Sequence, residues 1–312
     1  MAIGINRHSL QGQPVISGTP ACGPMNVPAV APSMAAPGDN RQGVERLEAD
    51  LLLEGLYQLH GADFRGYARA PLMQRLHAYM HGSGIDSISL LQDCIMRSRP
   101  QADALVRALS LRPAALFGDT DSVLHLRATL GPYLRSCALP KLWIAESTSA
   151  EEVFGLVILL IEEGLYDKTL IFVTAADDAL LAETRMGTFD VADMARYDDN
   201  YRRSGGRHAL SDYCSNVEGR MVFAPHLRNN LIWAQYDLAT DRSFNEFQLI
   251  LCRRVLPEFG PPLRRRALHL FADSLSSFGI LAVDVPDELD HAPMAFQFQT
   301  VSREHGLYRR IG

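Results

Sequence analysis

Carboxylate and hydroxyl side chains gather in one short stretch of this 312-residue chain, residues 142–155, which reads LWIAESTSAEEVFG. An apolar run gives way to small polar residues, then to Glu151 and Glu152, and then to the apolar run Val153–Ile161. This order predicts a strand, a turn and a buried helix. In an α/β fold, such a turn normally binds a nucleotide-type cofactor, because the start of the helix offers free backbone N–H groups. Close approach of the backbone to a ligand needs glycine, and this turn has none.

The composition is typical of a globular protein, with 47% hydrophobic residues and a formal net charge of -6. No apolar run approaches the ~20 residues that span a bilayer, so we expect no membrane insertion. The negative charge argues against binding to nucleic acid. The five cysteines are widely spaced and form no CxxC pair, which predicts free thiols and a cytoplasmic location.

The composition and periodicity of the chain change along its length and indicate which elements position this turn. Residues 1–43 are rich in Pro, Gly and Ala with almost no charge, which predicts a disordered tail. Helical periodicity then predicts an N-terminal helical domain at 44–118 and a linker helix at 119–135. Strands alternate with helices in 136–312, which predicts an α/β domain with a mainly parallel sheet. A polar stretch at about 191–228 is too long for an ordinary crossover and predicts a small inserted subdomain.

Periodicity and turn residues also predict the individual elements. We expect helices in the first part at Val44–His60, Ala68–His81, Ile88–Met96, Gln101–Leu111 and Asp121–Tyr133. We expect strands at Leu142–Ala145, Thr169–Thr174, Leu231–Tyr236, Phe247–Cys252 and Gly279–Val285. Further helices are expected at Glu151–Gly164, Asp177–Met186 and Pro262–Leu275.

Five stretches follow one another in an order that is typical of a known family. They are DFRGYARAPLMQRL (63–76), LWIAESTSAEEVFG (142–155), YRRSGGRHALSDYC (201–214), GRMVFAPHLRNNLIWAQYDLATD (219–241) and FNEFQLILCRRVL (244–256). Through them, the chain from about residue 48 to 285 resembles the chemotaxis receptor methyltransferase (CheR) family. The resemblance implies an N-terminal helical domain followed by a Rossmann-like class I methyltransferase domain. It also implies methyl transfer from S-adenosylmethionine to receptor glutamates.

The positions at which the resembling family contacts its cofactor have mostly changed. The turn that resembles GCSTGEE in the family keeps Glu151 and Glu152 but loses both glycines, at Glu146 and Ala150. The acidic residue that holds the ribose is replaced by Ala175, and the family pattern NxTxxxR falls on Arg112, Ala114 and Gly118. The Asn-Leu pair matches Asp237-Leu238, the Arg-Asn pair matches Arg253-Arg254, and the aromatic residue of IYF matches Glu258. Among the cofactor-binding positions, Glu151, Glu152, Leu238 and Arg253 therefore keep the family residue.

The size of these losses predicts that S-adenosylmethionine does not bind in the ordinary way. A charge-assisted hydrogen bond to the ribose contributes roughly 1.5–3 kcal/mol, and loss of the arginine beside the cofactor carboxylate costs about as much. Two independent losses weaken binding by roughly two to four orders of magnitude. Glu146 adds a negative charge where the methionyl carboxylate would lie.

Other residues allow two interpretations. Glu151 and Glu152 could contact a ligand, or they could stabilise the dipole of the helix that they begin. Arg253-Arg254 and Arg264–Arg266 could line an anion site or lie on the surface. His77 and His81 have the spacing of a two-histidine metal face, but no glutamate follows His77, so we expect no metal.

Two basic segments could instead recognise a protein. The aromatic and arginine residues of 201–213 could form a recognition surface or could be inherited structure. The resemblance implies a basic helix facing an acidic receptor around Arg69 and Arg75, but this chain has few cations there, which predicts weak electrostatic steering.

Our leading hypothesis is a non-catalytic CheR-like protein that binds a protein partner in bacterial signalling, with no catalytic residue and no cofactor. Two alternatives stay open. The first is an active S-adenosylmethionine-dependent protein-glutamate O-methyltransferase, and the second is a remodelled pocket that binds another nucleotide. The sequence leaves the oligomeric state open.

Overall fold

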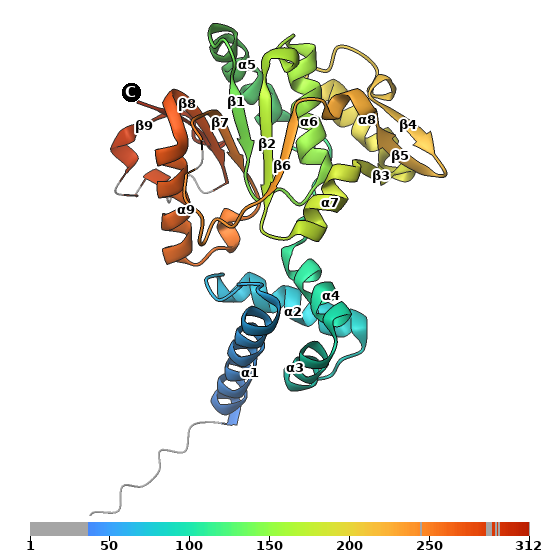
Figure 1. Ribbon diagram of the computed structural model, residues 1–312, viewed down its shortest axis with the longest axis vertical. Helices are drawn as coiled ribbons and strands as arrows, with labels where there is room; N and C mark the ends of the chain where they lie inside the picture. Colours follow the sequence, from blue (N-terminus) through green and yellow to red (C-terminus); the bar gives the residue numbers. More distant parts are fainter. Residues whose placement is uncertain (1–36, 244, 285–288, 291, 293, 312) are drawn as a thin grey trace, which may run out of the picture. The chain divides into compact units, whose positions relative to one another are not determined.

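The computed structural model describes residues 37–311, except for 244, 285–288, 291 and 293 (Figure 1). Contacts between residues divide the chain into a unit at 1–42 and a unit at 43–312. Most of the predicted tail lies outside the described residues, but helix α1 begins within it, at Pro37. Our predicted start at Val44 was therefore wrong. Proline is well suited to begin a helix, and the polar residues after Pro37 carry no apolar periodicity that could reveal it.

The first part of the described chain is entirely helical. Its helices are α1 (Pro37–His60), α2 (Arg69–Ser83), α3 (Ile88–Arg97), α4 (Arg99–Ser110) and α5 (Thr120–Ser136). Apolar residues of α1 to α4 form a core of their own, in which Leu52, Leu56 and Leu91 are fully buried. The four helices therefore bury their apolar faces mainly against one another, as the periodicity predicts.

A seven-stranded sheet follows. Its strands are β1 (Lys141–Ile144), β2 (Leu170–Ala175), β6 (Leu231–Gln235), β7 (Phe247–Cys252), β8 (Leu275–Val283), β9 (Phe298–Ser302) and β10 (Leu307–Arg310). They lie in the order β6-β2-β1-β7-β8-β10-β9. The first five are parallel, and β10 is antiparallel to both β8 and β9.

Helices cover both faces of this sheet, as expected for a mainly parallel sheet. They include α6 (Ala150–Glu162), α7 (Asp178–Met186) and α9 (Pro261–Ser274). Along β1 the side chains alternate: Leu142 and Ile144 join the core that contains α5 and α6, whereas Trp143 and Ala145 join the core that contains α9. The turn after β1 is therefore held rigidly from both faces of the sheet.

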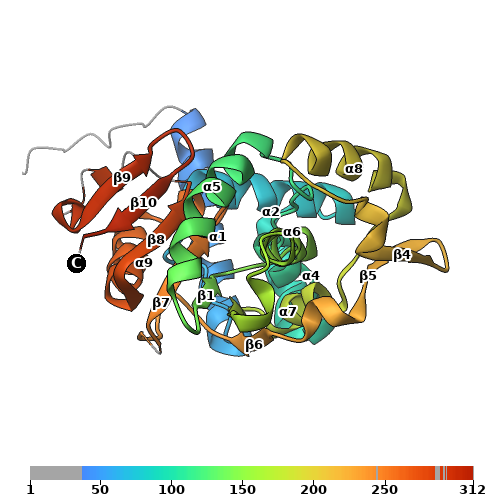
Figure 2. The same cartoon turned by 90° about the horizontal axis from the view of Figure 1, so that it is seen from above.

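The predicted insertion forms a separate antiparallel sheet beside the main one (Figure 2). Its elements are β3 (Thr188–Asp190), α8 (Met194–Arg203), β4 (Cys214–Val217) and β5 (Arg220–Phe223), with strand order β3-β5-β4. The ring of Phe223 stacks on Phe154 of α6, with 4.5 Å between the centroids. This contact fixes the insertion to the central helix.

Short 3-10 helices link several elements, at Tyr166–Lys168, Val191–Asp193, Leu210–Asp212, Pro225–Arg228, Leu256–Glu258 and Ala295–Gln297. The predicted fold class, a helical region followed by a Rossmann-like α/β region with a small insertion, is confirmed. Strand β8 begins at Leu275, earlier than the predicted Gly279, because the polar Ser276 and Ser277 conceal its start. The boundaries at 43, 118 and 135 stay predictions.

A buried ion cluster joins α5, α6 and the insertion. Arg127 on α5 contacts Glu162 at 2.7 Å and Glu163 at 3.2 Å, and all three side chains are at most 10% exposed. Arg207 of the insertion contacts Glu163 at 2.8 Å. Burial alone would raise the pKa of Glu162, but hydrogen bonds from the Arg207 N–H, from Tyr201 and from Arg127 lower it. The lowered pKa favours the ionised form of Glu162, which faces Arg127 inside the protein.

We expect Arg127→Met to lower the free energy of unfolding by about 3 kcal/mol, because it leaves buried carboxylates without their shared cation. Denaturation by urea measures this loss. The control is Arg97→Met, which removes the exposed pair with Asp93 and should cost less than about 1 kcal/mol. Equal effects of the two substitutions would contradict a stabilising role for the buried cluster.

Candidate functional site

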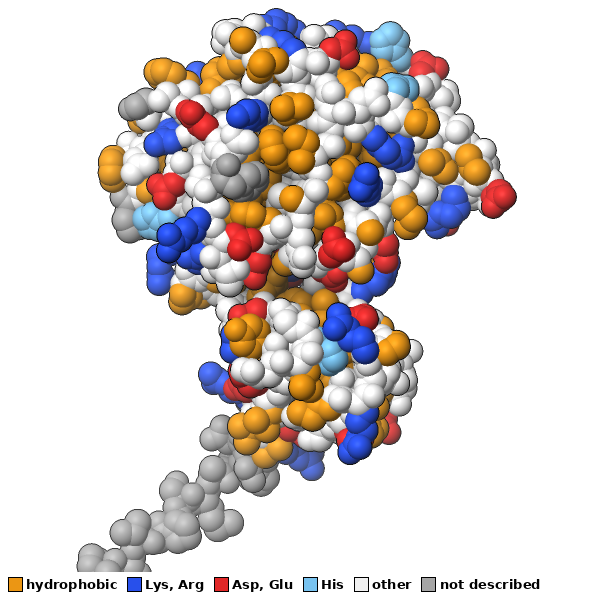
Figure 3. Space-filling view, viewed as in Figure 1, with side chains coloured by type: hydrophobic (Ala, Val, Ile, Leu, Met, Phe, Trp, Pro, Cys, Tyr) orange, Lys and Arg blue, Asp and Glu red, His pale blue; other side chains and the backbone are white. Residues whose placement is uncertain are grey.

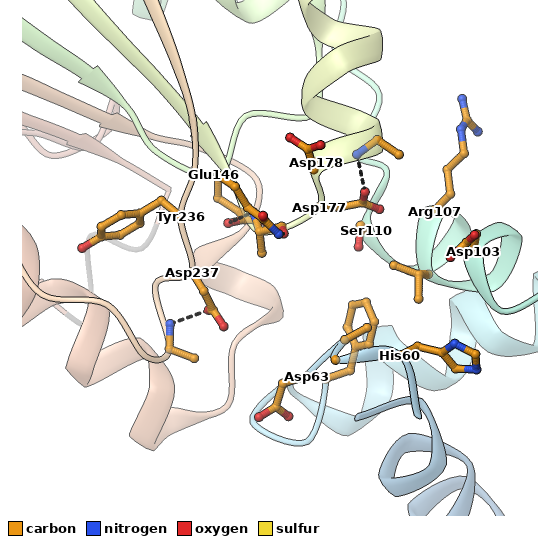
Figure 4. A pocket seen from close by; sticks show the side chains of 18 of the residues that line it. His60, Asp63, Asp103, Arg107, Ser110, Glu146, Asp177, Asp178, Tyr236 and Asp237 are labelled. Carbon is orange, nitrogen blue, oxygen red and sulfur yellow. Dashed lines mark hydrogen bonds between the residues drawn. The ribbon is translucent and has the colours of Figure 1, made fainter. Parts of the chain in front are cut away.

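A cavity of about 830 Å³ lies at the carboxyl ends of the parallel strands. The α/β region lines it with Glu146 after β1, with 176–178 after β2 and with 235–237 after β6. The helical region lines the facing wall with His60–Phe64 and with residues of α4 (Figure 4). This is the place where α/β sheets normally bind ligands. Its volume is that of a small-molecule site.

The lining of this cavity, which we call the large cavity, is predominantly acidic. Its carboxylates belong to Asp63, Asp103, Glu146, Asp177, Asp178, Asp237 and Asp241. Acidic side chains surround the hollow in the space-filling view (Figure 3). Two arginines line the cavity, and both are engaged: Arg99 with Asp103 at 2.7 Å, and Arg107 with Glu183 of α7 at 2.7 Å. The cavity therefore carries negative charge.

Glu146 occupies the turn after β1 in a backbone conformation that favours glycine. Its φ is 54°, in the left-handed region, and the residue is 5% exposed. Burial raises the pKa of its carboxyl to about 7, against the attraction of Arg112. Its two oxygens accept hydrogen bonds from the N–H of Ala176 at 3.3 and 3.4 Å. The turn thus has a backbone suited to glycine, while a buried carboxylate occupies the position.

Arg112 is buried between the helical and the α/β regions. It is 3% exposed, and its Nη2 lies 2.9 Å from Oε2 of Glu258. Its backbone N–H donates to Oγ1 of Thr148 at 3.1 Å. Arg75 of α2 forms a second ion pair with Glu258. Two positions that depart from the resembling family, Arg112 and Glu258, therefore contact each other directly.

Three of the four predicted cofactor-binding residues meet at a second, smaller cavity of about 110 Å³. Glu151, Glu152 and Arg253 line it, together with Gly118 and Arg254. Ser149 and Tyr197 donate hydrogen bonds to Glu151 at 2.8 and 3.2 Å. The fourth predicted residue, Leu238, is buried in the core that contains α9 and does not line either cavity.

The charged side chains at the small cavity contact one another. Glu152 lies 2.9 Å from Arg254, and Arg253 lies 3.7 Å from Asp284 and donates a hydrogen bond to the carbonyl of His305. Burial raises the pKa of Glu152, while Arg254 acts in the opposite direction. Each guanidinium already has a protein acceptor.

The two cavities share no lining residue. Ser110 lines the large one and Ala114 the small one, and the intervening Arg112 is buried. Likewise, Glu146 lines the large cavity and Glu151 the small one, while the serine and threonine residues between them are buried. Protein side chains therefore separate the two cavities.

From the sequence, Arg112 and Glu258 are two unrelated departures from the resembling family. Only their opposite charges indicate that they could form an ion pair. The sequence also did not identify His60 and Asp63, which line the large cavity from a loop and a helix end. Arg69 and Arg75, expected to face a receptor, form ion pairs with Asp50 and Glu258.

Two of the remaining candidates, His77 and Tyr201, have structural partners. His77 contacts Glu45 at 2.6 Å. No cluster of three His, Cys, Asp or Glu residues suited to a metal occurs among the described residues. Tyr201 is fully buried and donates a hydrogen bond to Glu162, which supports a structural role for this part of the insertion.

Comparisons with known proteins agree with the fold. A family model described as CheR methyltransferase, SAM binding domain, matches residues 117–305. A Pseudomonas putida protein named methyltransferase Cher3 is 31% identical over 85% of this chain and 97% of its own length. A chemotaxis protein methyltransferase of Vibrio parahaemolyticus is 26% identical over 71% of this chain and 81% of its own length.

Solved structures are similar only at a low level. The N-methyltransferase NodS of Bradyrhizobium japonicum, in complex with S-adenosyl-L-homocysteine, is 12% identical over 63% of this chain and 88% of its own length, with a TM-score of 0.34. This chain spans half or less of several other solved methyltransferase chains.

We expect Glu146→Gln to stabilise the protein at pH 8 but not at pH 5. The unfolded carboxyl loses its proton near pH 4.5, whereas the folded one keeps it until about pH 7. The wild-type free energy of unfolding therefore falls across this interval, by about 3 kcal/mol at about 1.4 kcal/mol per pH unit. Glutamine removes this loss. Urea denaturation of both proteins at pH 5 and pH 8 measures it, and an equal difference at the two pH values would contradict a buried, titrating Glu146.

Proposed function

Because the chain belongs to the CheR methyltransferase family, we propose that it is a non-catalytic member that acts as a binding or regulatory component of bacterial signalling. The observation that carries this proposal is the buried Arg112–Glu258 pair, which occupies two positions of the family's cofactor contacts. In place of contacts with a cofactor, these residues contact each other. The curated relatives named for chemotaxis support a signalling protein as partner.

Family membership implies S-adenosylmethionine as the cofactor, but the residues present do not fit it well. Its methionyl carboxylate needs a cation, and Gly118 supplies none. Arg253 and Arg254 are already bound to protein acceptors. Its ribose needs an acceptor at the end of β2, where Ala175 is fully buried. The buried carboxylate of Glu146, when ionised, would repel the methionyl carboxylate.

The proposal extends to location and partner. No helix of the described chain is long and apolar enough to cross a membrane. We place the protein in the cytoplasm and expect it to bind a protein there. The engagement of Arg69 and Arg75 in ion pairs supports a partner surface other than a strongly acidic receptor helix.

The active O-methyltransferase remains a second candidate. It is favoured by Glu151, Glu152 and Arg253, which lie together at the small cavity. A pocket for another nucleotide is less well supported, because the large cavity offers no free cation to a phosphate within the described residues.

We expect isothermal titration with S-adenosylmethionine and S-adenosylhomocysteine to give no binding at micromolar concentrations. Transfer of a tritiated methyl group to chemoreceptor fragments should stay at background. The same two measurements on the Pseudomonas putida relative provide a comparison. If the unmodified protein methylates the fragments, and if Glu151→Gln or Arg253→Ala abolishes this activity, the protein is an active methyltransferase instead.

We expect that restoring single positions does not restore cofactor binding. Ala175→Asp returns about 2 kcal/mol of ribose binding, roughly thirtyfold in affinity, but leaves Arg112 and Glu146 in place. A variant that combines Ala175→Asp, Glu146→Gly, Ala150→Gly, Gly118→Arg, Arg112→Asn and Glu258→Tyr should bind S-adenosylhomocysteine.

Calorimetry compares this variant with one that keeps Arg112 and Glu258. A Cβ at Gly118 would lie 2.9 Å from that of Ala115, so Ala115→Gly accompanies Gly118→Arg in both. Equal binding by the two variants would show that the ion pair does not obstruct the cofactor.

A further inference from the structure

The large cavity contains more carboxylates than its own residues neutralise. Asp63 contacts Arg65 at 2.9 Å, and Asp103 contacts Arg99. The other acidic side chains of the lining form no ion pair within the described part of the chain; they are Glu146, Asp177, Asp178, Asp237 and Asp241. Ionised carboxylates that are brought together repel one another, and a positive charge between them relieves this repulsion.

Glu146 is the most deeply buried carboxylate among the described residues of this lining. Its side chain is 5% exposed and lines the large cavity. The N–H of Ala176 is its hydrogen-bond donor, at 3.3 to 3.4 Å, which is longer than the usual 2.7–3.2 Å. A buried carboxylate can accept several hydrogen bonds, and no cation lies within ion-pair distance in the described chain. Its acceptor capacity is therefore largely unused.

The shape of the site argues against a metal ion. No three of these groups converge as metal ligands do among the described residues. The carboxylates are instead spread over two walls, with Glu146, Asp177 and Asp237 on one and Asp63 on the other (Figure 4). Phe64, Tyr67, Phe259 and Leu263 add apolar surface to the same lining. Aromatic and carboxylate groups together are the surroundings that organic ammonium ions prefer.

We propose that the large cavity binds an extended organic cation, a di- or polyamine, whose ammonium groups contact Glu146 and Asp237 and whose methylene chain lies against the aromatic wall. This inference rests on the proposed loss of S-adenosylmethionine binding. A polyamine has no carboxylate that would need the cation missing at Gly118, and no phosphate that the acidic lining would repel. It supplies the positive charge that the lining lacks.

Isothermal titration with spermidine, at low and at moderate salt, tests this inference on the full chain. We expect saturable binding with a stoichiometry near one. Glu146→Gln and Asp237→Asn should each weaken it by about tenfold, because each removes one charge-assisted hydrogen bond while keeping an acceptor for the backbone N–H. The control is Asp93→Asn, which removes the same charge from an exposed site on α3 outside the cavity and should leave affinity unchanged.

Three results would overturn the inference: no spermidine binding, binding that Asp93→Asn weakens as much as the cavity variants do, or displacement of spermidine by magnesium at equal concentration. The result for the polyamine site can be distinguished from the result for the proposed function. Methyl transfer by the unmodified protein overturns the proposed function whether or not spermidine binds. Absence of spermidine binding together with absence of methyl transfer overturns only the polyamine site.

Discussion

The buried guanidinium of Arg112 is the group on which the arrangement of this protein most depends. Removing an ion from water costs several kcal/mol, which only a well-placed counter-ion can offset. Glu258 supplies it, and the chain around Glu258 is itself tied to the helical region: its carbonyl accepts from the N–H of Ala68, and the N–H of Gly260 donates to the carbonyl of Gly66. The ion pair therefore joins the helical and the α/β regions.

The turn after β1 has a backbone conformation that favours glycine but carries a glutamate. A left-handed φ at a non-glycine residue costs roughly 1–2 kcal/mol, and Glu146 carries this cost together with burial of its carboxyl. The surrounding elements hold the turn, because β1 lies between β2 and β7 and α6 is buried along most of its length. The backbone conformation can therefore persist after the glycine is lost.

How far the sequence could predict the structure depends on the kind of signal. The buried strand β7 was predicted with its observed bounds, and α6 within two residues, because long apolar runs at the correct period leave few alternatives. Helix α8 and the strands β3, β4 and β5 were not assigned, because short polar segments carry little periodicity. The contact of Arg112 with Glu258 was also not predicted, because it joins distant segments that only tertiary packing brings together.

The replaced positions are better understood as a rebuilt site than as an eroded one. Substitution without compensation would leave unpaired charges at these positions. Instead, Arg112 is paired with Glu258, Arg254 with Glu152, and the space between the two cavities is filled. Glu146 and Asp237 are the exceptions, since both are carboxylates at family cofactor positions and neither has a cation among the described residues. Both line the large cavity, so the replaced positions that carry a carboxylate without a cation lie there.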